Sequence, residues 1–303
     1  MRHIPVLIKE TIDLLNLLPG KNAVDCTLGD AGHAEAILEK TAPNGKLLGI
    51  DADVESILRA KRNLYRFEER VIFVRDNFVN IKKIISESKI APINAILMDL
   101  GWSTPQFAER GRGFSFEKDE PLDMRYEHGQ EVQETAADIL NNYSQDDLAK
   151  ILKNFGEEKF YKEIAEAVVE ARREKKIETT KELTEIILQV YRKILKTDKE
   201  IPWIGGIHPA TQTFQALRIA VNRELEVLKK SLPDAVEALA PGGRLAVITF
   251  HSLEDRIVKQ YFKKIENKEV TLVNRKPITA GEEELQINPR ARSAKLRMVE
   301  KSR

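Results

Sequence analysis

Glycines and acidic residues gather in one short run, Val24–His33, which reads VDCTLGDAGH. Gly29 and Gly32 have two residues between them, which is the spacing G-x-x-G. A dinucleotide-binding fingerprint needs the spacing G-x-G-x-x-G. Asp25 and Asp30 flank Gly29, and two carboxylates would repel a pyrophosphate but suit a ligand that carries positive charge. The run therefore favours S-adenosylmethionine, with its ammonium and sulfonium groups, over a nicotinamide cofactor. An ordinary strand-to-helix turn with polar neighbours is the alternative.

A further carboxylate, Asp51, follows about twenty positions after Gly32 and closes a second run of β-forming residues, 46–51. A carboxylate at this place can accept hydrogen bonds from the hydroxyl groups of a ribose. Asp51 thus adds to the case for an adenosyl cofactor.

The apolar run 93–100 contains Asp99 near its end. In a doubly wound sheet the carboxyl end of this strand would lie beside that of the first strand, so Asp99 would face a bound methyl donor. There it could accept a hydrogen bond from an amino group and orient the nitrogen lone pair. An exocyclic base amine needs such help, because its lone pair is delocalised into the ring. Capping of the following turn is an equally good reading of Asp99.

The elements that must position these residues are predicted by hydrophobic pattern. In the first third of the chain, strand-like runs alternate with helical ones, which indicates βαβ units and a doubly wound parallel sheet. The strands are expected at 23–28, 46–51, 71–75 and 93–100, and the helices at 32–40, 54–68 and 79–88.

The middle of the chain has a different pattern, because no convincing strand is found between residues 110 and 206. Thr179 or Thr180 is a plausible N-cap, with Glu182 in the first turn of the helix that follows. Helical spacing covers 132–141, 145–154, 158–174 and 180–196.

Beyond residue 206 the α/β pattern returns. We expect a helix at 213–239 broken near Pro233, a turn at 241–243, a strand at 244–250, a helix at 253–265 and a last strand at 295–299. The resulting prediction is one α/β domain, 1–109 with 207–303, that is split in sequence by a helical insert, 110–206.

Composition limits the class of protein. The net charge is only +1 over 303 residues, so bulk charge gives no argument for nucleic-acid binding. Cys26 is the single cysteine, which excludes an intrachain disulfide and a cysteine-rich metal site. No stretch has the apolar centre of a signal peptide or the length of a membrane span. We expect a cytoplasmic protein with no bound metal.

Short motifs recur in order along nearly the whole chain. They are HIPVL at 3–7, DCTLGDAGH at 25–33, LMDLG at 97–101, RGRGFSF at 110–116, PLDMR at 121–125, FGEE at 155–158, HPAT at 208–211, TFQALRI at 213–219, FHSLEDR at 250–256 and NPRARS at 288–293. With these motifs the chain resembles the RsmH (MraW) family of bacterial ribosomal RNA small-subunit methyltransferases, which methylate cytosine N4.

This resemblance implies a Rossmann-like class I methyltransferase fold with a helical insert that recognises substrate. Asp99 is implied as the catalytic residue. From the residues alone, Phe78 could equally be a core aromatic, His33 the start of a helix and Gln106 a surface loop residue. The S-adenosylmethionine contacts carry over to Ala31, Gly32, His33, Asp51, Phe78, Asp99 and Gln106.

The implied substrate is one cytidine in the decoding region of 16S rRNA, within a small ribosomal subunit particle. Its amine pairs inside a helix or stack, so the base must be taken out to be reached. Substrate contacts are expected at Trp102, Arg218, His251 and Ser252, although His251 could equally be a structural hydrogen-bonding residue.

Two positions depart from the family pattern. Ala31 stands where glycine is usual, and Trp102 where a small aliphatic residue is usual. Trp102 either stacks on the substrate base or changes the width of the pocket.

The C-terminal run is rich in basic side chains, which would form either a phosphate-contacting edge or a solvated last strand. Its cations are Arg290, Arg292, Lys295, Arg297, Lys301 and Arg303, against Glu300.

Two other functions fit part of this pattern. One is an S-adenosylmethionine enzyme that acts on a small-molecule amine. The other is a non-catalytic rRNA-binding assembly factor in which the run Val24–His33, the cofactor cradle, only senses the cofactor.

Overall fold

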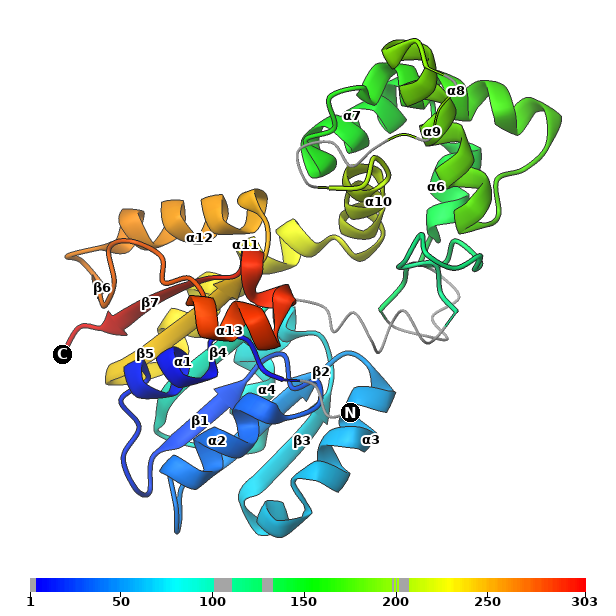
Figure 1. The fold of residues 1–303 in the computed structure, drawn as a ribbon. Coiled ribbons are helices and arrows are strands. Elements are labelled where there is room, and N and C mark those ends of the chain that lie inside the picture. Colours follow the sequence, from blue (N-terminus) through cyan, green and yellow to red (C-terminus); the bar gives the residue numbers. More distant parts are fainter. Residues whose placement is uncertain (1–3, 101–110, 127–132, 198, 200, 202–206) are drawn as a thin grey trace. The chain divides into compact units, whose positions relative to one another are not determined.

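The computed structural model describes residues 4–100, 111–126, 133–197, 199, 201 and 207–303. The chain forms two compact units (Figure 1). A sheet unit combines Met1–Gly101 with Leu225–Arg303, and a helical unit comprises Trp102–Glu224.

The sheet unit is built on a seven-stranded sheet in the order β3-β2-β1-β4-β5-β7-β6. The first five strands run parallel, and β7 is antiparallel to both β5 and β6. Strand order reverses between β1 and β4, which confirms the Rossmann-like, doubly wound fold. The strands are β1 (Asn22–Asp25), β2 (Leu47–Asp51), β3 (Val71–Arg75), β4 (Ile93–Asp99), β5 (Leu239–Thr249), β6 (Val270–Leu272) and β7 (Lys295–Lys301).

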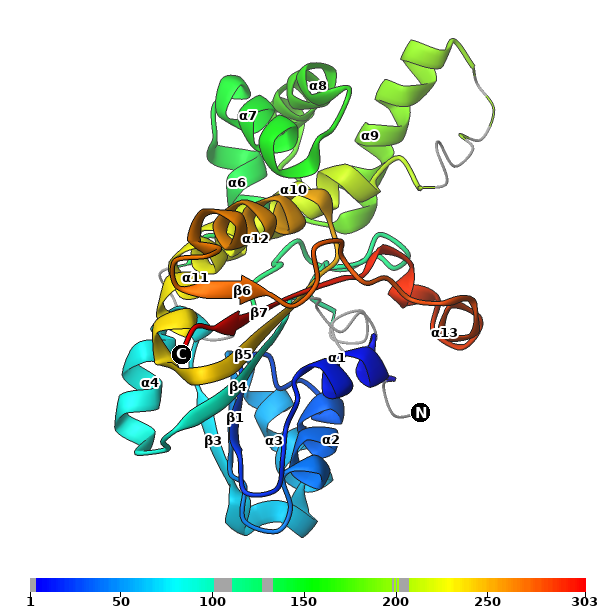
Figure 2. The same ribbon diagram turned by 90° about the vertical axis from the view of Figure 1, so that its left-hand side faces the viewer.

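Helices cover both faces of this sheet (Figure 2). Successive strand residues point to opposite faces, so Ala95 and Leu97 of β4 join one core cluster while Ile96 and Met98 join the other. Burial on both faces explains why this strand is a continuous apolar run. The first face is covered by α1 (Ile8–Leu14), α2 (Gly32–Lys40) and α3 (Val54–Asn63), and the second by α4 (Ile81–Ser88), α11 (Glu224–Ala238) and α12 (Ser252–Ile265).

Short helical segments complete the sheet unit at its loops. They are the 3₁₀ helices η1 (Tyr65–Arg70), η2 (Phe78–Asn80) and η3 (Pro289–Ser293), and the helix α13 (Glu282–Ile287). Helices α1 and α13 and strand β6 were not expected from the sequence pattern.

The helical unit has its own apolar core. Thr179 caps α9 as expected, in a capping box with Glu182. A Cβ on Gly156 would lie 2.5 Å from the Gln212 carbonyl oxygen, so this glycine permits close packing of α7 on α10. The helices are α6 (Ala136–Asn142), α7 (Gln145–Gly156), α8 (Tyr161–Glu174), α9 (Thr180–Leu195) and α10 (Thr211–Asn222).

The return to the sheet unit differs from the sequence expectation. The helix predicted at 213–239 breaks at Arg223, which takes a left-handed conformation with φ 50°, while Pro233 lies inside α11. Helix α10 belongs to the helical unit, although it falls within the range 207–303 expected for the core. The reason is its apolar face, including Phe214 and Leu217, which packs in the core of the helical unit.

Within the described parts of the chain, no helix combines the length and the apolar character needed to cross a bilayer.

Candidate active site

The carboxyl ends of β1 and β4 lie side by side at the point where strand order reverses. The backbone N–H of Cys26 donates to the Leu97 carbonyl at 2.9 Å, which continues the ladder just past β1. One residue further along, the Thr27 hydroxyl accepts from the backbone N–H of Asp99 at 2.8 Å. Thr27 thus ties the loop after β1 directly to Asp99.

The loop between β1 and α2 turns through two left-handed residues. Gly29 has φ 51°, which glycine adopts without strain, and Ala31 has φ 64° as the residue before α2. The Ala31 N–H donates to the Leu28 carbonyl at 2.7 Å. A left-handed alanine costs roughly 1–2 kcal/mol, which is a physical reason for the glycine that the resemblance leads us to expect at this position.

Asp51 ends β2 and braces this loop. Its Oδ2 accepts from the backbone N–H of Gly29 at 2.8 Å, and its Oδ1 accepts from that of Asp53 at 2.9 Å. Each carboxylate oxygen can accept a second bond, as a ribose hydroxyl would require. Burial raises the pKa of Asp51 to about 6, against the lowering effect of these two hydrogen bonds.

Asp25 lies buried at the end of β1. Burial raises its pKa to about 7, and the nearby Asp51 adds to the rise, while the hydrogen bond from the Thr27 N–H opposes it. Asp25 therefore keeps its proton to a higher pH than an ordinary carboxyl group does.

Asp30 has a different environment from the one expected. Its carboxylate accepts from Arg59 Nε of α3 at 2.7 Å. This ion pair neutralises the carboxylate, so Asp30 does not provide the uncompensated charge for a cationic ligand that the sequence suggested.

His33 lies in the first turn of α2 and is buried, with 6% of its side chain exposed. Its Nε2 bonds to the Val6 carbonyl at 3.1 Å, and its Nδ1 lies 3.6 Å from Asp99 Oδ2. The Asp99 carboxylate is 18% exposed. His33 does begin a helix, as the simple reading held, and its ring also faces the candidate catalytic carboxylate.

Phe78 opens η2 just beyond the carboxyl end of β3. It is partly buried and packs against the core of the second sheet face. The structure therefore places it at the same edge of the sheet as Asp51, where the strands have their carboxyl ends. Strands β2 and β1 lie between β3 and β4. Gln106 and Trp102 lie outside the described residues, as does the turn that Asp99 would cap.

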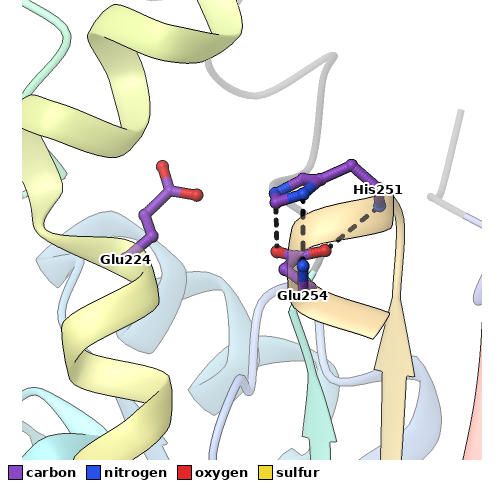
Figure 3. A group of neighbouring side chains, drawn as sticks. All are labelled: Glu224, His251 and Glu254. Carbon is purple, nitrogen blue, oxygen red and sulfur yellow. Dashed lines mark hydrogen bonds and ion pairs between the residues drawn. The ribbon is translucent and has the colours of Figure 1, made fainter. Parts of the chain in front are cut away.

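His251 and Ser252 follow β5, the neighbour of β4. His251 caps α12 in a capping box with Glu254, whose Oε2 accepts from the backbone N–H of His251 at 3.3 Å (Figure 3). The same oxygen also accepts from the N–H of Phe250 at 2.8 Å. His251 Nε2 lies 3.2 Å from Glu254 Oε1. The geometry gives His251 a structural role in starting the helix, while Ser252 is exposed in its first turn.

Arg218 belongs to the helical unit, in α10. It forms a two-pronged ion pair with Glu224, at 2.9 Å from Nε and 3.0 Å from Nη2. Both side chains are 11% exposed. Glu224, which is also labelled in Figure 3, opens α11.

Two side chains of the basic C-terminal run, Arg297 and Lys301, are committed to structure. Arg297 is buried and pairs with Asp255 at 2.6 Å, and Lys301 Nζ donates to the Glu237 and Leu239 carbonyls. The expectation of a phosphate-contacting edge is therefore wrong for Arg297, because a buried, paired guanidinium cannot reach a phosphate. Arg290 and Arg292 are exposed on η3.

Residues of the site that sequence reasoning missed lie near both ends of the chain. Pro5 packs against Gly32, since a Cβ there would come within 2.2 Å of Pro5 Cγ. Glu284 and Asn288 bond to the backbone at Leu7 and Ile4. The motifs HIPVL and NPRARS were visible in the sequence, but nothing in their residue types indicated this contact.

Comparison with known proteins gives a consistent result over the full chain. The sequence pattern described as the MraW methylase family matches residues 1–302. The chain is 45% identical over 316 residues to the ribosomal RNA small subunit methyltransferase H of Clostridium botulinum, and it covers 99% of each sequence. The protein of the same name from Streptococcus mutans is 46% identical over 318 residues, covering 99% of this chain and 98% of that one. Among solved structures, an rRNA methylase from Streptococcus thermophilus aligns over 99% of each chain with a TM-score of 0.46 and 12% identity.

Proposed function

The chain belongs to the MraW methylase family and is an S-adenosylmethionine-dependent methyltransferase, and we propose that it methylates N4 of one cytidine in the decoding region of 16S rRNA. Its relatives are named as methyltransferases of small-subunit ribosomal RNA. The observation that carries the proposal is Asp99 at the end of β4, with its backbone bonded to Thr27 of the cradle and its carboxylate facing His33.

The described residues fit the cofactor. The positive φ of Gly29 allows close approach of backbone to a ligand, and the Asp51 oxygens keep the capacity to accept hydroxyl hydrogens. We propose that Ala31, Gly32 and His33 hold the cofactor with Asp51, and that Phe78, Asp99 and Gln106 add to the site. When bound, the cofactor supplies an electrophilic methyl group.

The proposed work of the protein is alignment and charge stabilisation. Asp99 accepts a hydrogen bond from the exocyclic amine, which turns the nitrogen lone pair towards the methyl group. Its negative charge also offsets the positive charge that develops on the nitrogen as it attacks. The Thr27 hydroxyl accepts from the backbone N–H of Asp99, which fixes the main chain that carries this carboxylate.

Substrate recognition is assigned in the same proposal to the helical unit, with Arg218, and to Trp102, His251 and Ser252. Ser252 is exposed in the first turn of α12, which supports its part in this proposal. His251 also caps that helix. The cytidine must leave its stack to reach Asp99, so distorted or single-stranded RNA is the easier substrate. We propose a small-subunit particle as the physiological form.

The test is methyl transfer to purified small subunits from a strain that lacks this protein, followed by digestion of the RNA and mass spectrometry. We expect one N4-methylated cytidine in the decoding region. Methyl transfer to metabolites instead would favour a small-molecule methyltransferase. An unchanged cytidine pattern in the deletion strain would favour a binding factor without catalysis.

The Asp99→Asn variant tests the residue role. We expect turnover to fall by roughly 100-fold or more, the usual size of a lost proton-accepting group, while cofactor affinity changes by about threefold or less. Stopped-flow transfer and calorimetric titration with S-adenosylmethionine measure the two effects. Near-normal turnover would exclude this role for Asp99.

A further inference from the structure

The N-terminal segment Ile4–Leu7 lies directly on the cofactor cradle. Val6 contributes its carbonyl to His33 Nε2 at 3.1 Å, and Pro5 packs on Gly32, where no side chain would fit. The segment therefore contacts two of the residues that open α2.

The C-terminal part of the sheet unit holds this segment in place. Glu284 Oε1 accepts from the backbone N–H of Leu7 at 2.8 Å, and Asn288 Nδ2 donates to the Ile4 carbonyl at 3.1 Å. Asn288 is 6% exposed, so its amide is fixed by burial as well as by the bond. Glu284 and Asn288 thus clamp the segment on both sides of Val6.

The bond from Val6 decides which nitrogen of His33 carries hydrogen. A carbonyl oxygen only accepts, so Nε2 must be the protonated nitrogen. In a neutral ring Nδ1 then presents its lone pair to Asp99 Oδ2, 3.6 Å away. The lone pairs of Nδ1 and Oδ2 would repel each other if they faced one another directly. The contact between His33 and Asp99 becomes attractive when a proton lies between these two atoms.

We propose that His33 is a positioning residue for Asp99, and that the clamp formed by Glu284, Asn288 and the segment Ile4–Leu7 sets its ring. This inference rests on the proposed role of Asp99. Its force comes from the sensitivity of transfer to alignment, since a displacement of about 1 Å can cost about 100-fold in rate. Held by the Val6 carbonyl, the ring keeps the carboxylate turned towards the cradle.

Two substitutions at position 33 separate the halves of this contact. His33→Gln places an amide donor near Nε2 and can keep the bond to Val6, but it leaves nothing in the position of Nδ1. His33→Asn places its donor near Nδ1, within reach of Asp99, and gives up Val6. We expect His33→Gln to lower the single-turnover rate, measured at saturating cofactor, by about 30-fold. Saturation keeps any loss of cofactor affinity at this position out of the measured rate. His33→Asn should recover part of that rate.

The clamp is tested away from the cradle. Glu284→Ala removes the acceptor for Leu7, whereas Glu284→Gln keeps an amide oxygen that can accept the same bond. We expect a rate loss of about 5- to 10-fold for the alanine variant and recovery with glutamine. Glu283→Ala, at the exposed neighbour in α13, is the matched control and should leave the rate unchanged. Thermal unfolding of each variant shows whether the fold is retained.

A double-mutant cycle decides whether His33 acts through Asp99. In the Asp99→Asn background, His33→Gln should cause little further loss, because the group it positions is already gone. An undiminished additional loss, or a normal rate for His33→Gln alone, would overturn the inference. Full activity of Asp99→Asn would instead refute the proposed function, so the two failures are distinguishable.

Discussion

The sheet unit and the helical unit use buried polar groups differently. In the sheet unit, Asp25 and Asp51 end neighbouring strands, where burial raises the pKa of both carboxyls. In the helical unit, burial also raises the pKa of Glu158, against the hydrogen bonds that it accepts from the Phe160 N–H at 3.0 Å and the Tyr191 hydroxyl at 3.1 Å. The first arrangement concentrates costly carboxylates at one edge, as ligand sites do. The second joins helices to one another.

Arg218 and Glu224 extend this contrast. Their ion pair joins residues close in sequence within the helical unit. Asp51 instead bonds to the loop after β1, which belongs to another strand-helix segment. We infer that substitutions in the sheet unit act mainly on cofactor binding and chemistry, and those in the helical unit on RNA affinity and stability.

The Asp51→Asn substitution should have the largest effect on binding. The substituted amide would point its own hydrogens at the backbone N–H of Gly29 or of Asp53. The substitution also removes the negative charge that favours hydrogen bonds from the ribose hydroxyls. We expect the dissociation constant for S-adenosylmethionine to rise by roughly 10- to 100-fold, from the typical strength of hydrogen bonds to charged groups. Calorimetric titration measures this change. Asp30→Asn is the matched control, because Asp30 already pairs with Arg59, and a comparable rise there would remove the distinction between the two aspartates.

The Arg218→Ala substitution tests the other half of the comparison. Loss of the paired guanidinium should raise the KM for RNA by about 3- to 10-fold and lower the thermal midpoint, because the partly buried Glu224 loses its ion-pair partner and keeps the hydrogen bond from the Tyr126 hydroxyl. Cofactor affinity should stay unchanged. Arg218→Lys keeps the charge without the two-pronged geometry. Its KM for RNA and its thermal midpoint should lie between those of the parent and of Arg218→Ala. A cofactor defect as large as that of Asp51→Asn would contradict the division of labour.

The pH dependence of stability sharpens the contrast at Asp25. Burial raises the pKa of Asp25 to about 7, so between about pH 4 and about pH 7 the folded protein retains a proton that the unfolded chain has released. The free energy of unfolding of the ligand-free protein should therefore fall as pH rises through this window, by on the order of a few kcal/mol. Asp51 contributes in the same direction up to about pH 6.

Urea unfolding at about pH 5 and about pH 8 measures this effect. Asp25→Asn removes the titrating group and should flatten the profile, with its gain in stability seen at the higher pH. A variant with the same slope as the parent would show that Asp25 is not the source.

The Ala31→Gly substitution should have the smallest effect. Glycine relieves the left-handed strain at φ 64°, but it adds freedom to the unfolded chain. We expect a net gain in unfolding free energy of about 1 kcal/mol or less and no change in turnover. A loss of stability would mean that the methyl group of Ala31, which is buried in the sheet-unit core, contributes more by packing than its backbone costs.

Local sequence patterns predicted much of the fold. The continuous apolar run that became β4 reflects burial on both sheet faces, and the cap at Thr179 needs only a hydroxyl and Glu182 three positions later. The helix break at Arg223 escaped prediction, because proline drew attention to 233 while the left-handed residue is an arginine with no such signal.

The sequence by itself determined which carboxylates stand at the ends of β2 and β4. A doubly wound order brings such ends together, so Asp51 and Asp99 could be assigned to one edge before any coordinates. Only the tertiary structure decided which groups pair with the charged and polar side chains around this edge and in the interior. Arg59 neutralises Asp30, Asp255 holds Arg297 in the interior, and the segment Ile4–Leu7 reaches His33 while Glu284 and Asn288 grip it from the far end of the chain. These contacts join residues tens to hundreds of positions apart, where neither helical nor strand periodicity relates one side chain to the other, and only packing of the whole sheet unit brings them within bonding distance.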